Sequence, residues 1–180
     1  MIMIKDIRDI DFWSEFLREG SDFYGDIYSI DQSAFNSFVV ENFILIAKIK
    51  SLDEVIPNKD ELQNLVEKGY EHRCSQCHYS SKAIAIVDES YEYWTGFIYR
   101  NDSIYPVLTH SFNIKNRKVI DFSKVRENGD LIELVVDPNL PHWYYGIHIP
   151  TNFVSKYRDQ VFKEESMNPL LYEWLKQQGL

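Results

Sequence analysis

The pattern of apolar residues changes from helical to strand-like spacing near residue 91, and this change restricts the fold more than any other feature. Before it, apolar residues such as Phe35, Phe38, Val39 and Phe43 recur at a spacing of three to four positions, which is typical of amphipathic helices. After it, short aromatic and β-branched runs alternate with turn residues, which is typical of antiparallel strands. The sequence therefore predicts an α+β fold, with N-terminal helices followed by an antiparallel sheet.

We expect three helices in the first 70 residues. Asp11 can cap the first of them and Asn58 the third, because short polar side chains accept hydrogen bonds from the free N–H groups of a first helical turn. The second can begin at Asp31 or Ser33. Its apolar positions are Phe35, Phe38, Val39, Phe43, Ile46 and Ala47.

A helix over 77–87 is expected between the two halves, and another over 169–178 at the end. The expected strands are 91–99, 105–114, 118–122, 131–136 and 143–149. Nothing in the sequence resembles a linker, so we interpret 1–180 as one domain. Its parts are a helical subregion to residue 70, a helix with the antiparallel sheet over 71–160, and a C-terminal helix over 161–180.

Composition excludes several classes of protein. The 180 residues include 28 Asp and Glu against 19 Lys and Arg, and the net charge of −9 disfavours nucleic acid. The charge gives a modest preference for a basic peptide or protein substrate. Two cysteines do not make a disulfide scaffold. No apolar run reaches the roughly 20 residues that span a bilayer, and the first residues do not resemble a signal peptide. We expect a cytoplasmic protein that binds no membrane.

Cys77 stands where the helix over 77–87 should begin. Free backbone N–H groups and the positive end of the helix dipole both favour a thiolate over a thiol at this position. The same N–H groups can stabilise an oxyanion on a carbonyl that the sulfur attacks. Cys77 is therefore a candidate nucleophile, with a half-buried structural cysteine as the plainer alternative.

A hairpin farther along offers partners for this thiol. If Asn116 and Arg117 form a two-residue turn, His110 and Asp121 become diagonal neighbours on one face, roughly 7–8 Å apart at the backbone. A carboxylate at that distance can accept a hydrogen bond from an imidazole and orient it as a base. A three-residue turn would instead bring Asn113 into a new relation with the histidine, and asparagine can also orient such a base.

Several short motifs resemble the transglutaminase-like and papain-like cysteine enzymes, in particular their small bacterial and phage members. Residues 77–81 are similar to the start of the catalytic helix in that group, although Ser80 and Ser81 stand where Asn and Ala are commoner. Residues 109–113 and 118–121 resemble its His and Asp strands, and 144–150 resembles a late strand that ends in proline. The resemblance covers about residues 72–150.

The resemblance implies acyl transfer by a Cys-His-Asp triad: proteolysis, deamidation, transamidation or acetyl transfer. Cys77 would attack a carbonyl carbon, His110 would accept and return the proton, and Asp121 would hold the imidazole. Gln76, Asn113 and Tyr145 are secondary candidates near the oxyanion. The implied substrate is a protein or peptide, and no cofactor is expected.

Two other classes stay open. His72, Cys74, Cys77 and His78 lie within seven residues, with spacing that suits half of a zinc site, so a small zinc-stabilised domain is one alternative. A redox CxxC motif is less favoured, because no βαβ pattern surrounds it. The other alternative is a non-enzymatic binding module of the same fold. Its candidate contact residues are Tyr91, Tyr93, Trp94, Phe97, Tyr99, Trp143, Tyr144 and Tyr145.

Overall fold

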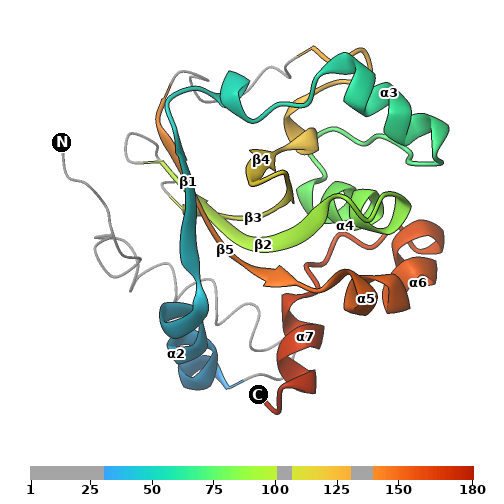
Figure 1. The fold of residues 1–180 in the computed structure, drawn as a ribbon. Coiled ribbons are helices and arrows are strands. Elements are labelled where there is room, and N and C mark those ends of the chain that lie inside the picture. Colours follow the sequence, from blue (N-terminus) through green and yellow to red (C-terminus); the bar gives the residue numbers. More distant parts are fainter. Residues whose placement is uncertain (1–30, 101–106, 131–139) are drawn as a thin grey trace.

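A curled five-stranded antiparallel sheet forms the centre of the protein, with helices packed around it (Figure 1). The computed structural model describes residues 31–100, 107–130 and 140–180. The strand order is β1-β5-β2-β3-β4. The strands are β1 (Ile44–Ile49), β2 (Glu92–Tyr99), β3 (Val107–Lys115), β4 (Lys118–Ile120) and β5 (His142–Ile149). This arrangement confirms the α+β class predicted from the sequence.

The hairpin between β3 and β4 has the register predicted from the sequence. Asn116 and Arg117 have φ of 53° and 64°, which are the left-handed values that a two-residue type I′ turn requires. Lys115 pairs with Lys118, and Asn113 pairs with Ile120. This register decides which side chains share a face of β3.

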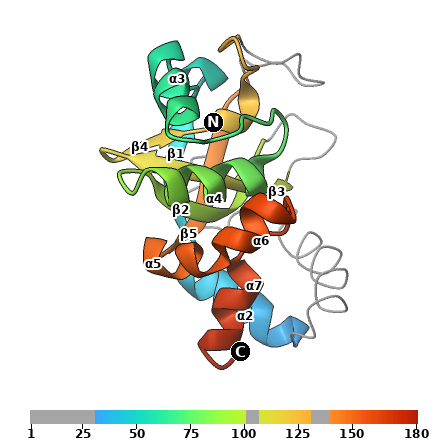
Figure 2. The ribbon, with the colours of Figure 1, turned by 90° about the vertical axis from the view of Figure 1, so that its right-hand side faces the viewer.

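The two central strands, β2 and β5, approach each other closely where Gly96 pairs with Gly146. A Cβ atom on Gly96 would lie 2.1 Å from the carbonyl oxygen of Tyr145, so no other residue fits there without moving the backbone. This close approach of β2 and β5 lets the sheet curl tightly, and both ribbon views show the curl (Figures 1 and 2).

Helices α2 (Gln32–Asn42) and α7 (Leu171–Gln177) pack together at one end of the sheet. The rings of Phe35 and Tyr172 stack 5.5 Å apart between these helices. Their apolar faces join residues of the sheet in one core cluster. The helix expected over 169–178 therefore corresponds to α7, which closes this end of the core. Residues 161–180 do not form one helix, because the preceding helix ends at Lys163.

Helix α4 (Cys77–Val87) crosses β2 and β3 and is almost entirely buried along its middle. Helix α3 (Lys59–Glu67), capped by Asn58 as expected, covers one side of it. The other side packs against three shorter helical segments: α5 (Thr151–Val154), η4 (Ser155–Tyr157) and α6 (Arg158–Lys163). These neighbours fix the direction of α4 and hence the position of its first residue.

The strand expected over 118–122 ends earlier, at Ile120, because Phe122–Lys124 form a short 3-10 helix. The prediction for residues 43–47 was wrong. The helix expected to run through Ile46 and Ala47 ends at Asn42, and the following residues form β1, which pairs with β5. A run such as Phe43–Ala47 is apolar enough for either structure, and the open edge of β5 decides between them. The helix expected after Asp11 and the strand expected over 131–136 lie outside the described residues. Among the described residues, no helix has the length and apolar character needed to cross a membrane.

Candidate active site

Cys77 is the first residue of α4, as predicted, and its thiol is partly buried. No side chain caps this helix, so N–H groups of its first turn stay available. Ser75 just before it has a φ of 62°, and its amide donates to the carbonyl oxygen of Ser123 at 2.9 Å. This contact ties the start of α4 to the short helix η3 (Phe122–Lys124), which follows β4.

His110 and Asp121 meet as the hairpin register predicts. Nε2 of His110 lies 2.7 Å from Oδ2 of Asp121, and the two residues are only 3% and 1% exposed. Strand β4 pairs only with residues 113–115 of β3, so the part of β3 that carries His110 has no described strand on that side. Cys77 can therefore approach the ring from this edge.

Two further groups hold the Asp121 carboxylate in place. The hydroxyl of Tyr144 donates to Oδ2 at 3.1 Å, and the hydroxyl and amide of Ser123 donate to Oδ1 at 2.6 and 3.2 Å. Both oxygens thus accept hydrogen bonds inside the protein, which compensates for the burial of a charge. Because Asp121 occupies Nε2 of His110, Nδ1 is the ring nitrogen left to exchange a proton with Cys77.

The charges of these three residues depend on one another. Burial works to raise the pKa of the Cys77 thiol, but the charge and hydrogen bond of His110, followed by those of His78, hold it well below its usual range. Burial works to lower the pKa of His110, but Asp121 and Cys77 raise it to about 9. Burial would raise the pKa of Asp121, and the charge of His110 holds it well below its usual range instead. These shifts favour a thiolate–imidazolium pair over a neutral thiol and imidazole.

His78 is a second neighbour of the Cys77 thiol, and the sequence analysis did not predict this role for it. Nδ1 of His78 lies 2.7 Å from the hydroxyl of Ser111, which itself donates to Thr95 at 3.0 Å. The hydroxyl of Tyr93 lies 3.3 Å from the same oxygen. Since Ser111 gives its proton to Thr95, it accepts from His78. Side chains alternate between the two faces along β3, so Ser111 points to the face opposite to His110. This alternation could have revealed the contact between Ser111 and His78.

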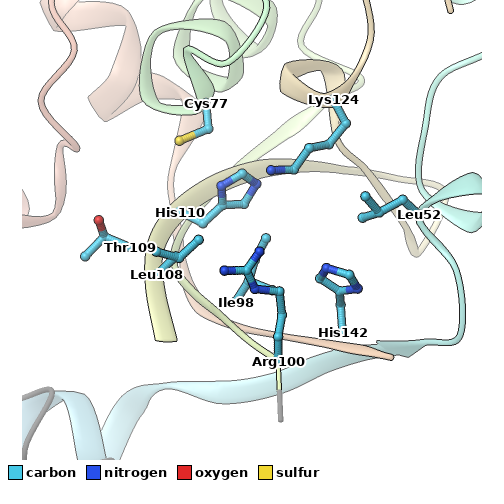
Figure 3. A pocket seen from close by; sticks show the side chains of 9 residues that line it. All are labelled: Leu52, Cys77, Ile98, Arg100, Leu108, Thr109, His110, Lys124 and His142. Carbon is cyan, nitrogen blue, oxygen red and sulfur yellow. The ribbon is translucent and has the colours of Figure 1, made fainter. Parts of the chain in front are cut away.

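A cavity of about 210 Å³ opens beside Cys77 and His110 (Figure 3). Its other described lining residues are Leu52, Ile98, Arg100, Leu108, Thr109, Lys124 and His142. The volume is several times the roughly 30 Å³ that a water molecule takes up in the liquid, yet below the roughly 300 Å³ at which pockets for drug-sized ligands begin. A single side chain or a short acyl group would fill it.

The secondary site candidates do not all meet at this cavity. The amide of Asn113 donates to the carbonyl oxygens of Ser81 and Glu92 at 2.9 and 3.3 Å, so it braces α4 against β2. The side-chain oxygen of Gln76 is buried and has no partner among the described residues. Gln76 directly precedes Cys77 and remains a candidate for a secondary role near the oxyanion.

Tyr145, a secondary candidate near the oxyanion, is not among the described residues that line the cavity. Its ring stacks on Phe97 at 5.1 Å inside the core cluster that α2 and α7 cover. Successive residues of a strand point to opposite faces, so the neighbouring Tyr144 is the tyrosine that reaches Asp121. The sequence showed two adjacent tyrosines and gave no reason to prefer either.

The alternative zinc ligands do not come together. Both ring nitrogens of His72 have protein partners, with Nε2 lying 2.8 Å from the carbonyl oxygen of Val125. Cys74 is exposed, whereas His78 turns toward Ser111. Within the described ranges, no three His, Cys, Asp or Glu side chains are grouped to hold a metal ion.

The aromatic residues considered for a binding surface lie mostly in the interior. Of the eight, only Trp94 is not fully buried, and it packs against His148 at 5.5 Å. The others fill the core clusters on the two faces of the sheet. They therefore account for packing and offer little exposed area to a partner.

No family model, curated protein or solved structure matches the chain.

Proposed function

We propose that the protein is a cysteine-dependent acyl-transfer enzyme with a papain-like or transglutaminase-like core, in which Cys77, His110 and Asp121 form the triad. The observation that carries the proposal is the buried His110–Asp121 pair beside a helix-start cysteine whose pKa is held low. A structural cysteine needs neither partner, and perturbed groups that line a cavity are typical of active sites.

The first half of the reaction forms a thioester. The Cys77 thiolate attacks the carbonyl carbon of the substrate, a C–S bond forms, and the carbonyl electrons move onto oxygen. Backbone N–H groups at the start of α4 lie next to this sulfur and would stabilise the oxyanion. His110 then gives the proton on Nδ1 to the leaving group, the bond to that group breaks, and the acyl-enzyme remains.

The second half releases the acyl group. Water or an amine attacks the thioester, His110 takes its proton on Nδ1, and the thiolate of Cys77 leaves. Asp121 stays ionised throughout and stabilises the imidazolium. Water as acceptor gives a peptidase or deamidase, whereas an amine gives a transferase, and the fold alone is compatible with either.

Alkylation with iodoacetamide tests the proposal, because Cys74 and Cys77 lie in one chain and serve as a matched pair. The rate at each thiol is followed by peptide mass spectrometry from pH 4 to pH 10. We expect Cys77 to react at pH 6, well below the roughly 8.5 at which a free thiol is half ionised, and to slow in His110→Gln. Equal pH profiles at Cys77 and at the exposed Cys74 would refute a triad.

The zinc-stabilised alternative is tested in the same samples by metal analysis. Stoichiometric zinc, with both thiols protected from iodoacetamide and the zinc lost in Cys77→Ala, would refute the enzyme and support a metal site. The binding-module alternative predicts two slowly reacting thiols and no bound metal.

A further inference from the structure

A second histidine, His142, lines the cavity beside the triad, and Figure 3 shows its ring on the same cavity as Cys77 and His110. It is the first residue of β5 and is only 2% exposed. Its Nδ1 lies 2.6 Å from the carbonyl oxygen of Leu140. Because a carbonyl oxygen can only accept, Nδ1 carries a hydrogen. Burial lowers the pKa of His142 to about 4, although the hydrogen bond to Leu140 opposes this shift, so the ring is neutral.

This tautomer makes the other ring nitrogen of His142 a hydrogen-bond acceptor. A neutral imidazole with its hydrogen on Nδ1 has a lone pair and no hydrogen on Nε2. Among the described residues, no group donates to Nε2. Since so little of the residue is exposed, the cavity is the space in which Nε2 can meet a donor. A ligand in the cavity can supply that donor.

Lys124 supplies the complementary donor. It is the last residue of η3, and Figure 3 shows its amine extending into the same cavity. Leu52 and Ile98 are buried and give the cavity apolar walls. Two further polar residues of the described lining, Arg100 and Thr109, already take part in other interactions. The lining therefore offers an acceptor, a donor and room for a short aliphatic chain.

These groups favour a neutral ligand that both donates and accepts. A cationic side chain would lie beside the amine of Lys124, and none of the described lining residues is acidic. A carboxylate could pair with Lys124 but would turn a lone pair toward Nε2 of His142, which cannot donate. An apolar side chain would leave both polar groups without partners, which costs free energy. A carboxamide satisfies both, because its NH₂ group donates and its oxygen accepts.

Building on the proposed function, we propose that the acyl group accepted by Cys77 belongs to a glutamine or asparagine residue, whose side-chain carboxamide donates to Nε2 of His142 and accepts from Lys124. The carbonyl that reacts is the backbone carbonyl of that residue. Its carbon forms a bond to the sulfur of Cys77 and loses its bond to the leaving amine, which takes a proton from His110. The cavity volume of about 210 Å³ suits one side chain of this size. The selected residue is thus neutral, in contrast to the basic substrate suggested by the net charge of the chain.

Binding without reaction tests the recognition. The probes are the N-acetyl N-methylamides of glutamine, glutamate, lysine and methionine, whose side chains have similar lengths and differ in charge and hydrogen bonding. Their effects on the melting temperature are measured at equal concentration and ionic strength. We expect the glutamine derivative to raise the melting temperature most. An equal or larger rise with any of the other three derivatives would overturn the inference.

Three variants assign this preference to its residues. His142→Phe keeps a ring and removes Nε2, so the advantage of the glutamine over the methionine derivative should disappear. His148→Phe makes the same change on the same strand, at a residue outside the described lining, and should keep the advantage. Lys124→Met changes a partly exposed side chain and should reduce the advantage, and it decides alone if His142→Phe does not fold. An advantage that is undiminished in the folded variants of His142 and Lys124 would overturn the inference.

Protection of Cys77 locates the bound group beside the triad. The glutamine derivative should slow the alkylation of Cys77 by iodoacetamide and leave the exposed Cys74 unaffected. Half-protection should need about tenfold less of it than of the methionine derivative, since only the carboxamide pairs both polar groups. A glutamine preference in melting temperature without protection of Cys77 would place the ligand elsewhere and overturn the inference. Equal alkylation profiles at Cys77 and Cys74, with a glutamine preference that still depends on His142, would instead refute the triad and leave the recognition site standing.

Discussion

The hydroxyl of Tyr144 lies 3.1 Å from Oδ2 of Asp121, the same oxygen that contacts His110. Burial and the charge of Asp121 raise the pKa of Tyr144 well above its usual range, so this hydroxyl stays protonated and donates. Tyr144 thus orients the carboxylate as a neutral hydrogen-bond donor and adds no negative charge beside it. A tyrosine that a strand prediction treats as core packing becomes part of the site.

Asp121→Asn is expected to weaken the thiolate while preserving the fold. The amide oxygen of asparagine can still accept from Ser123, but its NH₂ group cannot accept from Nε2 of His110. Loss of the carboxylate lowers the pKa of the imidazolium and raises that of the thiol. The iodoacetamide rate at Cys77 near pH 6 should fall about tenfold for each unit by which the thiol pKa rises.

Cys74 provides the control for this variant, because its rate should not change. Circular dichroism checks that the asparagine protein is folded. An unchanged pH profile at Cys77 in a folded Asp121→Asn protein would show that Asp121 does not support the imidazolium.

Ser111→Ala tests whether His78 is a positioning residue. The variant leaves Nδ1 of His78 without its acceptor and breaks the contact with Thr95. We expect the free energy of unfolding to fall by about 1–3 kcal/mol, because buried polar groups lose their partners. The pH profile of Cys77 alkylation should shift upward, by less than in Asp121→Asn.

Ser90→Ala is the comparison for this loss, since Ser90 is exposed and its hydroxyl donates to the carboxylate of the nearby Asp88. Both unfolding free energies are measured in urea. If Ser111→Ala is destabilised but the pH profile of Cys77 alkylation does not shift, His78 contributes only to packing.

Lys82 should make stability depend on pH in the neutral to alkaline range. Its side chain is fully buried in α4, and its amine donates to the carbonyl oxygens of Ser166 and Asn168 at 3.0 and 2.5 Å. Burial lowers its pKa from 10.5 to about 7. Between these values the unfolded chain binds the proton and the folded chain does not, so the free energy of unfolding rises with pH.

Lys82→Met removes this titration at the cost of two unpaired carbonyl groups. The stability of the variant relative to the original protein should be highest below pH 7 and should decline from pH 7 to about 10.5. Urea unfolding at several pH values measures the difference. A difference that does not vary with pH would mean that the buried amine keeps its proton throughout.

Gly96→Ala should destabilise the sheet strongly. Its new Cβ atom would collide with the backbone at Tyr145 and Gly146, and neither neighbour can move without breaking the β2–β5 pairing. Overpacking of this kind costs roughly 1–3 kcal/mol or more. Gly69→Ala, where nothing lies within 4 Å of the new atom, measures the backbone strain alone and should cost less. Equal losses of unfolding free energy in the two variants would contradict the close approach of β2 and β5 at Gly96.

Local chemistry accounts for what the sequence could predict. The Asn58 cap, the helix that begins at Cys77 and the two-residue turn at Asn116 and Arg117 each depend on a few neighbouring residues. The turn in particular fixed the register, and through it the meeting of His110 with Asp121. These parts of the fold and of the site could be stated in advance.

Tertiary structure decided the rest, because the deciding interactions join distant segments. Phe43–Ala47 fits a helix or a strand by composition, and only the edge of β5 selects the strand. The choice of Tyr144 over Tyr145 depends on which face of β5 turns toward Asp121. Arg100 and Lys124 come from different elements and line the same cavity, and a net charge of −9 summed along the chain does not indicate which charged side chains lie near each other.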